Sequence, residues 1–284
     1  MRCISKICTR WASGLTFLVF SSFVNGQNIH ISHCLEACPS GNDDNEIVIR
    51  HLYASQVSRS TGIVDWVAYR VLPDAIGVAS LLPRYWKQDE LLSDSSLLEV
   101  GLNISTIEQP DLRDAQDRDY RVNEFVVNSD SKGRLAPMTS FADTPYWDDL
   151  NYSSNMAPLP SDLRLGAWSR LDQAINELSA TDGPIYVVSG PIYKTEGFDL
   201  VKRYDEPPES YFKVIATHKA YASFTFAADL PIHAEYCLQV ETIDEIQKSS
   251  GLQVFPYMHS VLQPDLYGPL RCEQQFESFQ DRNN

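Results

Sequence analysis

Basic residues are scarce in this sequence. Its 284 residues hold 23 Lys and Arg against 38 Asp and Glu, which gives a formal net charge of −15 at pH 7. Such a charge repels polyanions at long range, so nucleic-acid binding requires a local basic site. Glycine and proline, at 13 and 16, are too few for a collagen-like or low-complexity chain, and no internal period indicates a repeat protein.

Long hydrophobic runs are absent after the N-terminal segment. A positively charged start precedes a short apolar run at 11–24, and small residues follow at 24–26. This pattern predicts a signal peptide over 1–26, because the run is short for a membrane span of about 20 apolar residues. A membrane anchor is the alternative. We expect a secreted protein, extracellular or periplasmic, without membrane attachment after cleavage. Cleavage removes three basic and no acidic residues, so the formal charge of −15 becomes −18.

Cysteine is also sparse. Two of the six cysteines lie in the predicted signal peptide, which leaves Cys34, Cys38, Cys237 and Cys272. An even number in an exported chain indicates two disulfides. Three pairings exist, and the spacing favours Cys34–Cys38 as a local loop and Cys237–Cys272 as a C-terminal clasp. A zinc site is the alternative, but no pair of histidines lies at ligand spacing beside these cysteines.

Residues 27–284 are predicted to form a single α+β domain. The predicted strands alternate irregularly with few helices, which favours this class over a doubly wound parallel sheet. We expect strands at 63–71 and 185–189, the second ended by Gly190-Pro191, and a pair of strands over 211–226 that turns near His218-Lys219. We expect helices over 163–178, from apolar residues at helical spacing, and from the capping box of Thr242 and Glu245 to Gly251.

Several short blocks become specific when their order and spacing are taken together. They are HCLEACPSG at 33–41, DWVAYRV at 65–71, SKGRLAP at 131–137, SNMAP at 154–158, LGAW at 165–168 and SGPIY at 189–193. Together they resemble the DNA/RNA non-specific endonucleases, which are secreted metal-dependent nucleases with a ββα-metal (His-Me finger) site. The resemblance covers most of the chain after the signal peptide. It implies a central, mostly antiparallel sheet with flanking helices, and disulfides at both cysteine pairs.

The resemblance also implies a mechanism and a set of site residues. In that family a histidine takes a proton from the attacking water, and Mg²⁺ held by an asparagine stabilises the developing charge. Arginines bind the phosphate, and a glutamate supports the water shell of the metal. Here Arg134 stands at the histidine position, Arg164 at the asparagine position and Asp172 at the glutamate position. Arg70, Lys132 and Asn155 keep the character of the family's residues.

These departures predict the loss of ordinary nuclease chemistry. A guanidinium has a pKa above about 12 and no lone pair to offer, so Arg134 is not a base near neutral pH. Arg164 brings a fixed cation and no oxygen ligand, so we expect Mg²⁺ binding to be lost. None of the six histidines is a convincing substitute base. We expect both arginines to act as countercharge to Asp172 in a salt bridge, and Asn155 to stabilise a loop.

Three classes of function remain open. The first is a degenerate nuclease that binds DNA, RNA or phosphate without cutting, through Arg70, Lys132, Arg134 and Arg164. The second is an active, divergent nuclease that uses other groups. The third is an exported interaction protein without nucleic-acid affinity, which the acidic charge favours. The sequence leaves a homodimer open, and Asn103 and Asn151 fit the weak pattern for glycosylation.

Overall fold

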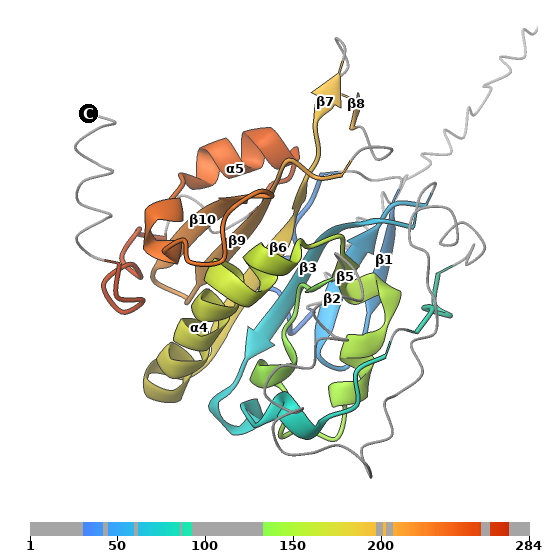
Figure 1. The fold of residues 1–284 in the computed structure, drawn as a ribbon, viewed down its shortest axis with the longest axis vertical. Coiled ribbons are helices and arrows are strands. Elements are labelled where there is room, and N and C mark those ends of the chain that lie inside the picture. Colours follow the sequence, from blue (N-terminus) through green and yellow to red (C-terminus); the bar gives the residue numbers. More distant parts are fainter. Residues whose placement is uncertain are drawn as a thin grey trace, which may run out of the picture.

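A six-stranded sheet is the framework of the computed structural model (Figure 1). Its strands lie in the order β1-β2-β3-β6-β9-β10, and every neighbouring pair is antiparallel, which confirms the predicted α+β class with an antiparallel central sheet. The strands are β1 (Glu46–Ile49), β2 (Tyr53–Val57), β3 (Val64–Val71), β6 (Ile185–Ile192), β9 (Ser210–Ala216) and β10 (Tyr221–Ala227).

Short elements and helices surround this sheet. Small two-stranded sheets form between β4 and β5 and between β7 and β8. The short strands are β4 (Gly133–Arg134), β5 (Met156–Ala157), β7 (Thr195–Glu196) and β8 (Val201–Lys202). The described α-helices are α3 (Ser161–Leu163), α4 (Ser169–Asp182) and α5 (Ile243–Ser250). The shorter helical turns used below are η6 (Trp147–Asn151), η8 (Arg164–Trp168) and η9 (Tyr236–Gln239). The structure describes residues 31–41, 45–59, 62–85, 87–92, 133–196, 201–202, 207–256 and 262–272, so the predicted signal peptide lies outside it.

Apolar side chains cover both faces of the sheet. On one face, Tyr69 of β3 belongs to a core that includes Leu171 of α4. On the other face, Trp66 of β3 belongs to a second core that includes Ile246 of α5. Successive side chains of a strand point to opposite faces, so neighbours on β3 enter different layers. The sheet is therefore the middle layer between α4 and α5.

Strand β6 is longer than the sequence predicted. The prediction ended it at Gly190-Pro191, whereas the strand continues to Ile192. Strand β3 pairs with β6 only as far as Ser189, so Pro191 lies where β6 has a partner on the β9 side alone. An edge position of this kind tolerates a residue without an N–H group. A Cβ at Gly190 would collide with the backbone oxygen of Asp65, so glycine permits the close approach of β3.

The predicted helix over 163–178 is interrupted. Gly166, within η8, has φ −96° and ψ −120°, which is outside the helical region. A Cβ added at Gly166 would lie 2.5 Å from the carbonyl oxygen of Ile232. The break therefore occurs where the chain packs directly against another backbone. It separates Arg164, at the start of η8, from the regular helix α4.

The sequence signals for the C-terminal half are confirmed. The side chain of Thr242 accepts a hydrogen bond from the backbone N–H of Glu245 at 3.2 Å and begins α5. Gly251 ends this helix with φ 72°, a left-handed conformation that glycine adopts without steric cost. Strands β9 and β10 form the predicted pair, and the chain turns between Ala216 and Tyr221.

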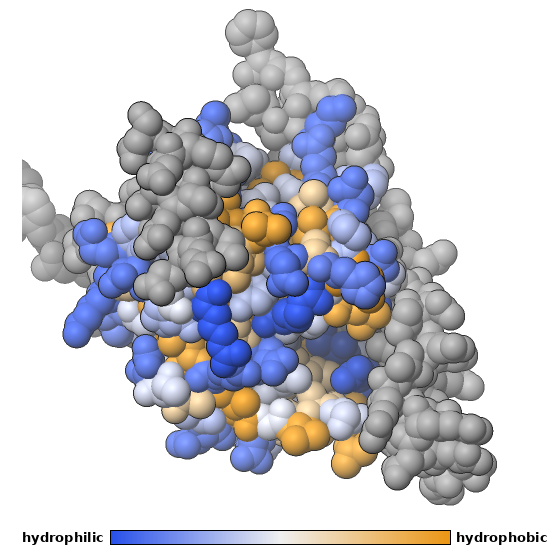
Figure 2. Space-filling view, turned by 60° about the vertical axis from the view of Figure 1, so that its left-hand side comes forward, coloured by the Kyte–Doolittle hydropathy of each residue, from blue (hydrophilic) through white to orange (hydrophobic). Residues whose placement is uncertain are grey.

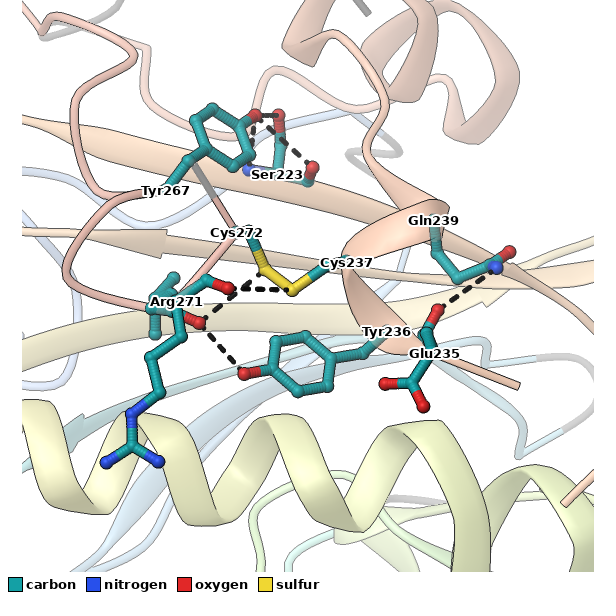
Figure 3. The surroundings of a disulfide bond; sticks show 9 residues. Ser223, Glu235, Tyr236, Cys237, Gln239, Tyr267, Arg271 and Cys272 are labelled. Carbon is teal, nitrogen blue, oxygen red and sulfur yellow. Dashed lines mark hydrogen bonds between the residues drawn. A yellow bond between two sulfur atoms is a disulfide. The ribbon is translucent and has the colours of Figure 1, made fainter. Parts of the chain in front are cut away.

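Both predicted disulfides form. Cys34–Cys38 and Cys237–Cys272 have Cα–Cα distances of 4.9 and 5.1 Å. Figure 3 shows the second disulfide beside the ring of Tyr236, whose hydroxyl donates to the carbonyl oxygen of Leu270 at 2.8 Å. The neighbouring Arg271 binds Glu177 of α4 at 2.7 Å. This clasp therefore ties the last described residues to η9 and to α4.

Polar side chains dominate the face drawn in Figure 2, where hydrophobic residues are scattered between them. In the part of the chain that the structure describes, we find no helix with the length and apolar character needed to cross a bilayer.

Candidate functional site

Arg134, which the sequence analysis singled out, lies in the small sheet of β4 and β5, opposite Met156. Its guanidinium donates a hydrogen bond to Oδ1 of Asn151, and Nδ2 of Asn151 donates to Asp148 at 3.0 Å. Arg134 is half-buried, and the amide of Asn151 is one of its partners. Asn151 is completely buried, so the folded protein has no room for a glycan on its side chain.

Asn155 stabilises the loop that follows Arg134. Its Nδ2 donates to the carbonyl oxygens of Ala136 and Leu150 at 3.0 and 3.1 Å, and its Oδ1 accepts from the N–H of Ala136 at 2.8 Å. The side chain is completely buried. This is the loop-stabilising role that the sequence predicts, and it makes Asn155 a positioning residue.

Arg164 reaches the same region from the start of the helical segment. Its N–H donates to the carbonyl oxygen of Pro160 at 2.9 Å, which begins the turn after β5. Leu159, just before that proline, packs so closely on Gly133 that a Cβ there would meet it at 2.6 Å. Because Gly133 adjoins Arg134, this packing holds the two arginine-bearing segments together.

Arg84 is a third arginine at this site, and the sequence analysis did not identify it. The segment after Arg84 runs beside η6, because the N–H of Lys87 donates to the carbonyl oxygen of Asn151 at 2.8 Å. The ammonium group of Lys87 also binds Asp148. Asp148 and Asn151, which support Arg134, thus also hold the segment that carries Arg84.

The charges of the three arginines act on one another. Burial, and then the charges of Arg84 and Arg164, lower the pKa of Arg134 to about 9. Burial, and then the charge of Arg84, lower the pKa of Arg164. Both groups remain protonated at neutral pH, because arginine does not deprotonate there. We call these three residues, Arg84, Arg134 and Arg164, the arginine cluster.

Asp172 has a different countercharge from the one expected. It lies on α4, buried, and forms an ion pair with the completely buried Lys213 of β9. The ammonium group also lies 3.9 Å from the ring centroid of Trp168. Burial raises the pKa of Asp172, and Lys213 opposes that rise. The expectation that Arg134 and Arg164 pair with Asp172 is wrong, because Lys213 extends from the sheet directly under α4.

Arg70 does not belong to the arginine cluster, contrary to the sequence analysis. From Trp66 to Val71, β3 alternates strictly between the two cores, which places Arg70 on the face of Trp66 and Ala68. After burial, the charge of Arg70 is among the causes that lower the pKa of His33, next to the first disulfide. The strand's alternation therefore separates Arg70 from Arg134. Lys132 lies outside the described residues.

One histidine is held in a defined orientation. Nδ1 of His51 lies 2.8 Å from the carboxylate of Asp149, and its ring stacks on Tyr146 with centroids 4.1 Å apart. The His51 side chain is 60% exposed. An imidazole oriented through Nδ1 presents Nε2 to the other side, as a general base does. Asp149 belongs to η6, as does the Asn151 that binds Arg134.

The described residues do not fit the magnesium site that the resemblance implies. The carboxylate of Asp172 is bound by Lys213, and the nearby Arg134 and Arg164 offer guanidinium groups rather than oxygen ligands. Mg²⁺ prefers oxygen ligands and is repelled by nearby cations. Within the described ranges, no three His, Cys, Asp or Glu side chains gather as a metal-ligand set.

Comparisons with known proteins bear on both the fold and the site. Residues 35–260 match the family described as DNA/RNA non-specific endonuclease. The chain is 30% identical over 262 residues to a nuclease of Serratia marcescens, an alignment that covers 89% of this chain and 91% of the relative. It is 26% identical over 184 residues to the mitochondrial nuclease EXOG of Danio rerio, covering 58% and 52%. A crystal structure of the EndoG/EndoGI complex is similar with a TM-score of 0.53 at 20% identity, covering 77% of this chain and 89% of that chain.

Proposed function

Because this chain belongs to the DNA/RNA non-specific endonuclease family and has the ββα-metal fold, we propose that it is a secreted pseudonuclease that binds nucleic-acid phosphate without metal-dependent cleavage. The observation that carries this proposal is the arginine cluster. Two of its members stand where the family has its base and its metal ligand, and a guanidinium performs neither task. Guanidinium groups bind phosphate well, because their fork of donors matches its oxygens.

Export is part of the same proposal. Two disulfides form in a chain of this size, and disulfides persist in oxidising compartments. The N-terminal pattern over 1–26 supports a cleaved signal peptide. Binding of DNA or RNA is then an extracellular or periplasmic event.

A second candidate is an active nuclease with a different base. His51 favours it, because its imidazole is oriented by Asp149. Asp149 lies on the same short helix, η6, as the Asn151 that binds Arg134. In this case the arginine cluster stabilises the phosphate while His51 takes the proton from water. A third candidate, an interaction protein without nucleic-acid affinity, has the net charge of −15 in its favour.

Digestion and binding assays separate the three candidates. We expect the wild-type protein to leave plasmid DNA and RNA intact in Mg²⁺ or Mn²⁺. It should bind both with an affinity that falls steeply with salt, because phosphate contacts release counterions. Arg134→Ala and Arg164→Ala should each weaken DNA and RNA binding alike, whereas Arg59→Ala, a matched exposed arginine beyond β2, should not.

Each competing result has a definite meaning. If the wild-type protein cleaves nucleic acid and His51→Ala abolishes the cleavage, the protein is an active enzyme and the pseudonuclease proposal is wrong. Absence of binding at low salt, with folding intact by circular dichroism, would favour the interaction protein.

A further inference from the structure

We propose that the rings of His51 and Tyr146, here called the ring stack, bind an unpaired nucleobase. This inference rests on the proposed function, because it adds a site for bases to a chain proposed to bind nucleic-acid phosphate. It also names the form of nucleic acid that the stack selects, which is a single strand rather than a duplex. The ligand class is a planar heterocyclic base, carried by a single strand or by a free nucleoside.

The geometry of the two rings is the first argument. Their centroids lie 4.1 Å apart and their planes differ by 6°, so the rings lie face to face. Nδ1 of His51 lies 2.8 Å from the carboxylate of Asp149, and the backbone N–H of His51 donates to the same carboxylate at 3.2 Å. Asp149 follows Tyr146 closely in the chain, so one short segment positions both rings. Rings held in this way lose little freedom when a third ring is added.

The exposure of the ring stack is the second argument. The side chain of His51 is 60% exposed, and Tyr146 is 47% exposed. Tyr146 covers one face of the imidazole and Asp149 lies against its Nδ1 edge, so the exposed area includes the opposite face of the ring. An aromatic face that is open to water gains from contact with a further ring. Every base offers such a ring, so this contact does not depend on sequence.

The charges beside the ring stack are the third argument. Asp148 and Asp149 lie on η6, which follows Tyr146, and Lys87 is paired with Asp148. The carboxylate of Asp149 disfavours a phosphate at the stack, whereas the neutral face of a base has no charge for it to repel. A duplex presents its phosphates outward and keeps its bases inside the helix. The ring stack therefore suits an unpaired base.

His218 provides an internal comparison for His51. Its side chain is 63% exposed, close to the value for His51, and it also lies beside a tyrosine. The ring of Tyr186 meets it at 74° with centroids 5.5 Å apart, so this pair has an edge contact and no parallel stack. His218→Ala is therefore a control that matches His51→Ala in residue type and exposure.

The test uses strands that differ only in their bases. Single-stranded 12-mers, one with a base on every sugar and one abasic throughout, are titrated into the full mature protein with EDTA present, and binding is followed by fluorescence anisotropy. A duplex of the same length and free adenosine are measured alongside. We expect the strand with bases to bind at least about fivefold more tightly than the abasic strand, which has the same phosphates. A single 2-aminopurine in the strand reports stacking directly, because stacking quenches its fluorescence.

Variants connect this preference to the ring stack. His51→Ala and Tyr146→Leu should each remove most of the preference for the strand with bases, and should leave duplex binding unchanged. Tyr146→Phe should retain the preference because the aromatic face remains, and His218→Ala should retain it as well. Both rings are exposed, so the variants should fold, which circular dichroism checks. A preference that persists in both His51→Ala and Tyr146→Leu would overturn the inference, as would binding of the 2-aminopurine strand without quenching.

The remaining outcomes distinguish this inference from the proposed function. Equal affinity for the strand with bases and the abasic strand would overturn the inference and leave phosphate binding intact. No binding of any strand, duplex or nucleoside would overturn both. Binding of adenosine alone, abolished by Tyr146→Leu, would support the ring stack with a free nucleoside as its ligand and would count against the proposed binding of nucleic acid.

Discussion

At the scale of single residues, two positions decide whether the inherited site can hydrolyse a phosphodiester. From the sequence blocks, we expect Arg134 and Arg164 to stand at the positions of the family's base and metal ligand. In Arg134→His/Arg164→Asn the imidazole would supply a base with a pKa near about 6.5, and the amide oxygen would supply a ligand for Mg²⁺. We expect the double variant to gain Mg²⁺-dependent cleavage of plasmid DNA and RNA.

The single variants are the controls for this gain of activity. Each restores half of the mechanism, so neither should cut. Asp172 must also leave Lys213 to support a metal, which should keep the rate of the double variant low. A double variant that folds, binds Mg²⁺ and remains inactive would mean that the site has diverged beyond these two positions.

Loss of Lys213 should strongly destabilise the protein. In Lys213→Met the carboxylate of Asp172 remains buried without its counterion, which costs about 3–5 kcal/mol. Adding Asp172→Leu should recover most of this loss, since two apolar side chains replace the pair. Urea unfolding measures both changes. Lys248→Met, at an exposed position of α5, should change the free energy of unfolding by no more than about 0.5 kcal/mol.

Short sequence blocks single out individual residues, but they do not reveal the tertiary partners of those residues. The assignment of Arg134, Arg164 and Asp172 to the site rests on such blocks and stays a prediction, whereas the partner of Asp172 comes from β9, far along the chain. Arg70 was misplaced because a strand with apolar residues on both faces does not reveal which face turns to the site. Arg84 lies in a loop-rich stretch without periodicity, so no pattern in the sequence marked it.

At the scale of elements, the break at Gly166 positions Arg164 relative to α4. Gly166→Ala places a methyl group against the backbone of Ile232, which should destabilise the fold by about 1–3 kcal/mol. Because relief of this contact shifts η8, phosphate binding at Arg164 should weaken as well. Leu165→Ala, next to it and 41% exposed, is the control and should leave both properties nearly unchanged. Unfolding and phosphate titration would check both effects, and a tolerated Gly166→Ala would contradict this role of the break.

Elements with their own end signals were predicted best. Helix α5 follows from Thr242 and Gly251, and the β9–β10 pair from its turn. The break in the predicted helix over 163–178 escaped prediction, because apolar spacing continues through Gly166 and the cause is packing against Ile232. The sequence also failed to predict the extension of β6 to Ile192. Pro191 fits in this strand because it pairs only with β9, and that pairing is a tertiary contact.

At the scale of the whole molecule, the two disulfides should contribute unequally. The Cys237–Cys272 pair closes a sequence separation of 35, and Cys34–Cys38 one of 4. Chain-entropy estimates give about 4 kcal/mol for the longer loop and about 2 kcal/mol for the shorter one. Paired Cys→Ser variants, compared by urea unfolding, should show the larger loss for the clasp. Equal losses would indicate that native contacts, rather than loop length, set these contributions.

The connection between β3 and β6 has a consequence for the order in which the sheet assembles. Val71 pairs with Ile185 across the intervening residues 72–184, whereas β1, β2 and β3, and likewise β9 and β10, follow one another closely. Bringing distant segments together costs more conformational entropy and slows folding. Val187→Ala at this central seam should therefore slow refolding in stopped-flow experiments, while Val48→Ala on the outer strand should mainly speed unfolding. We therefore expect the pairing of β3 with β6, which joins the two halves of the sheet, to be the step that limits the folding rate.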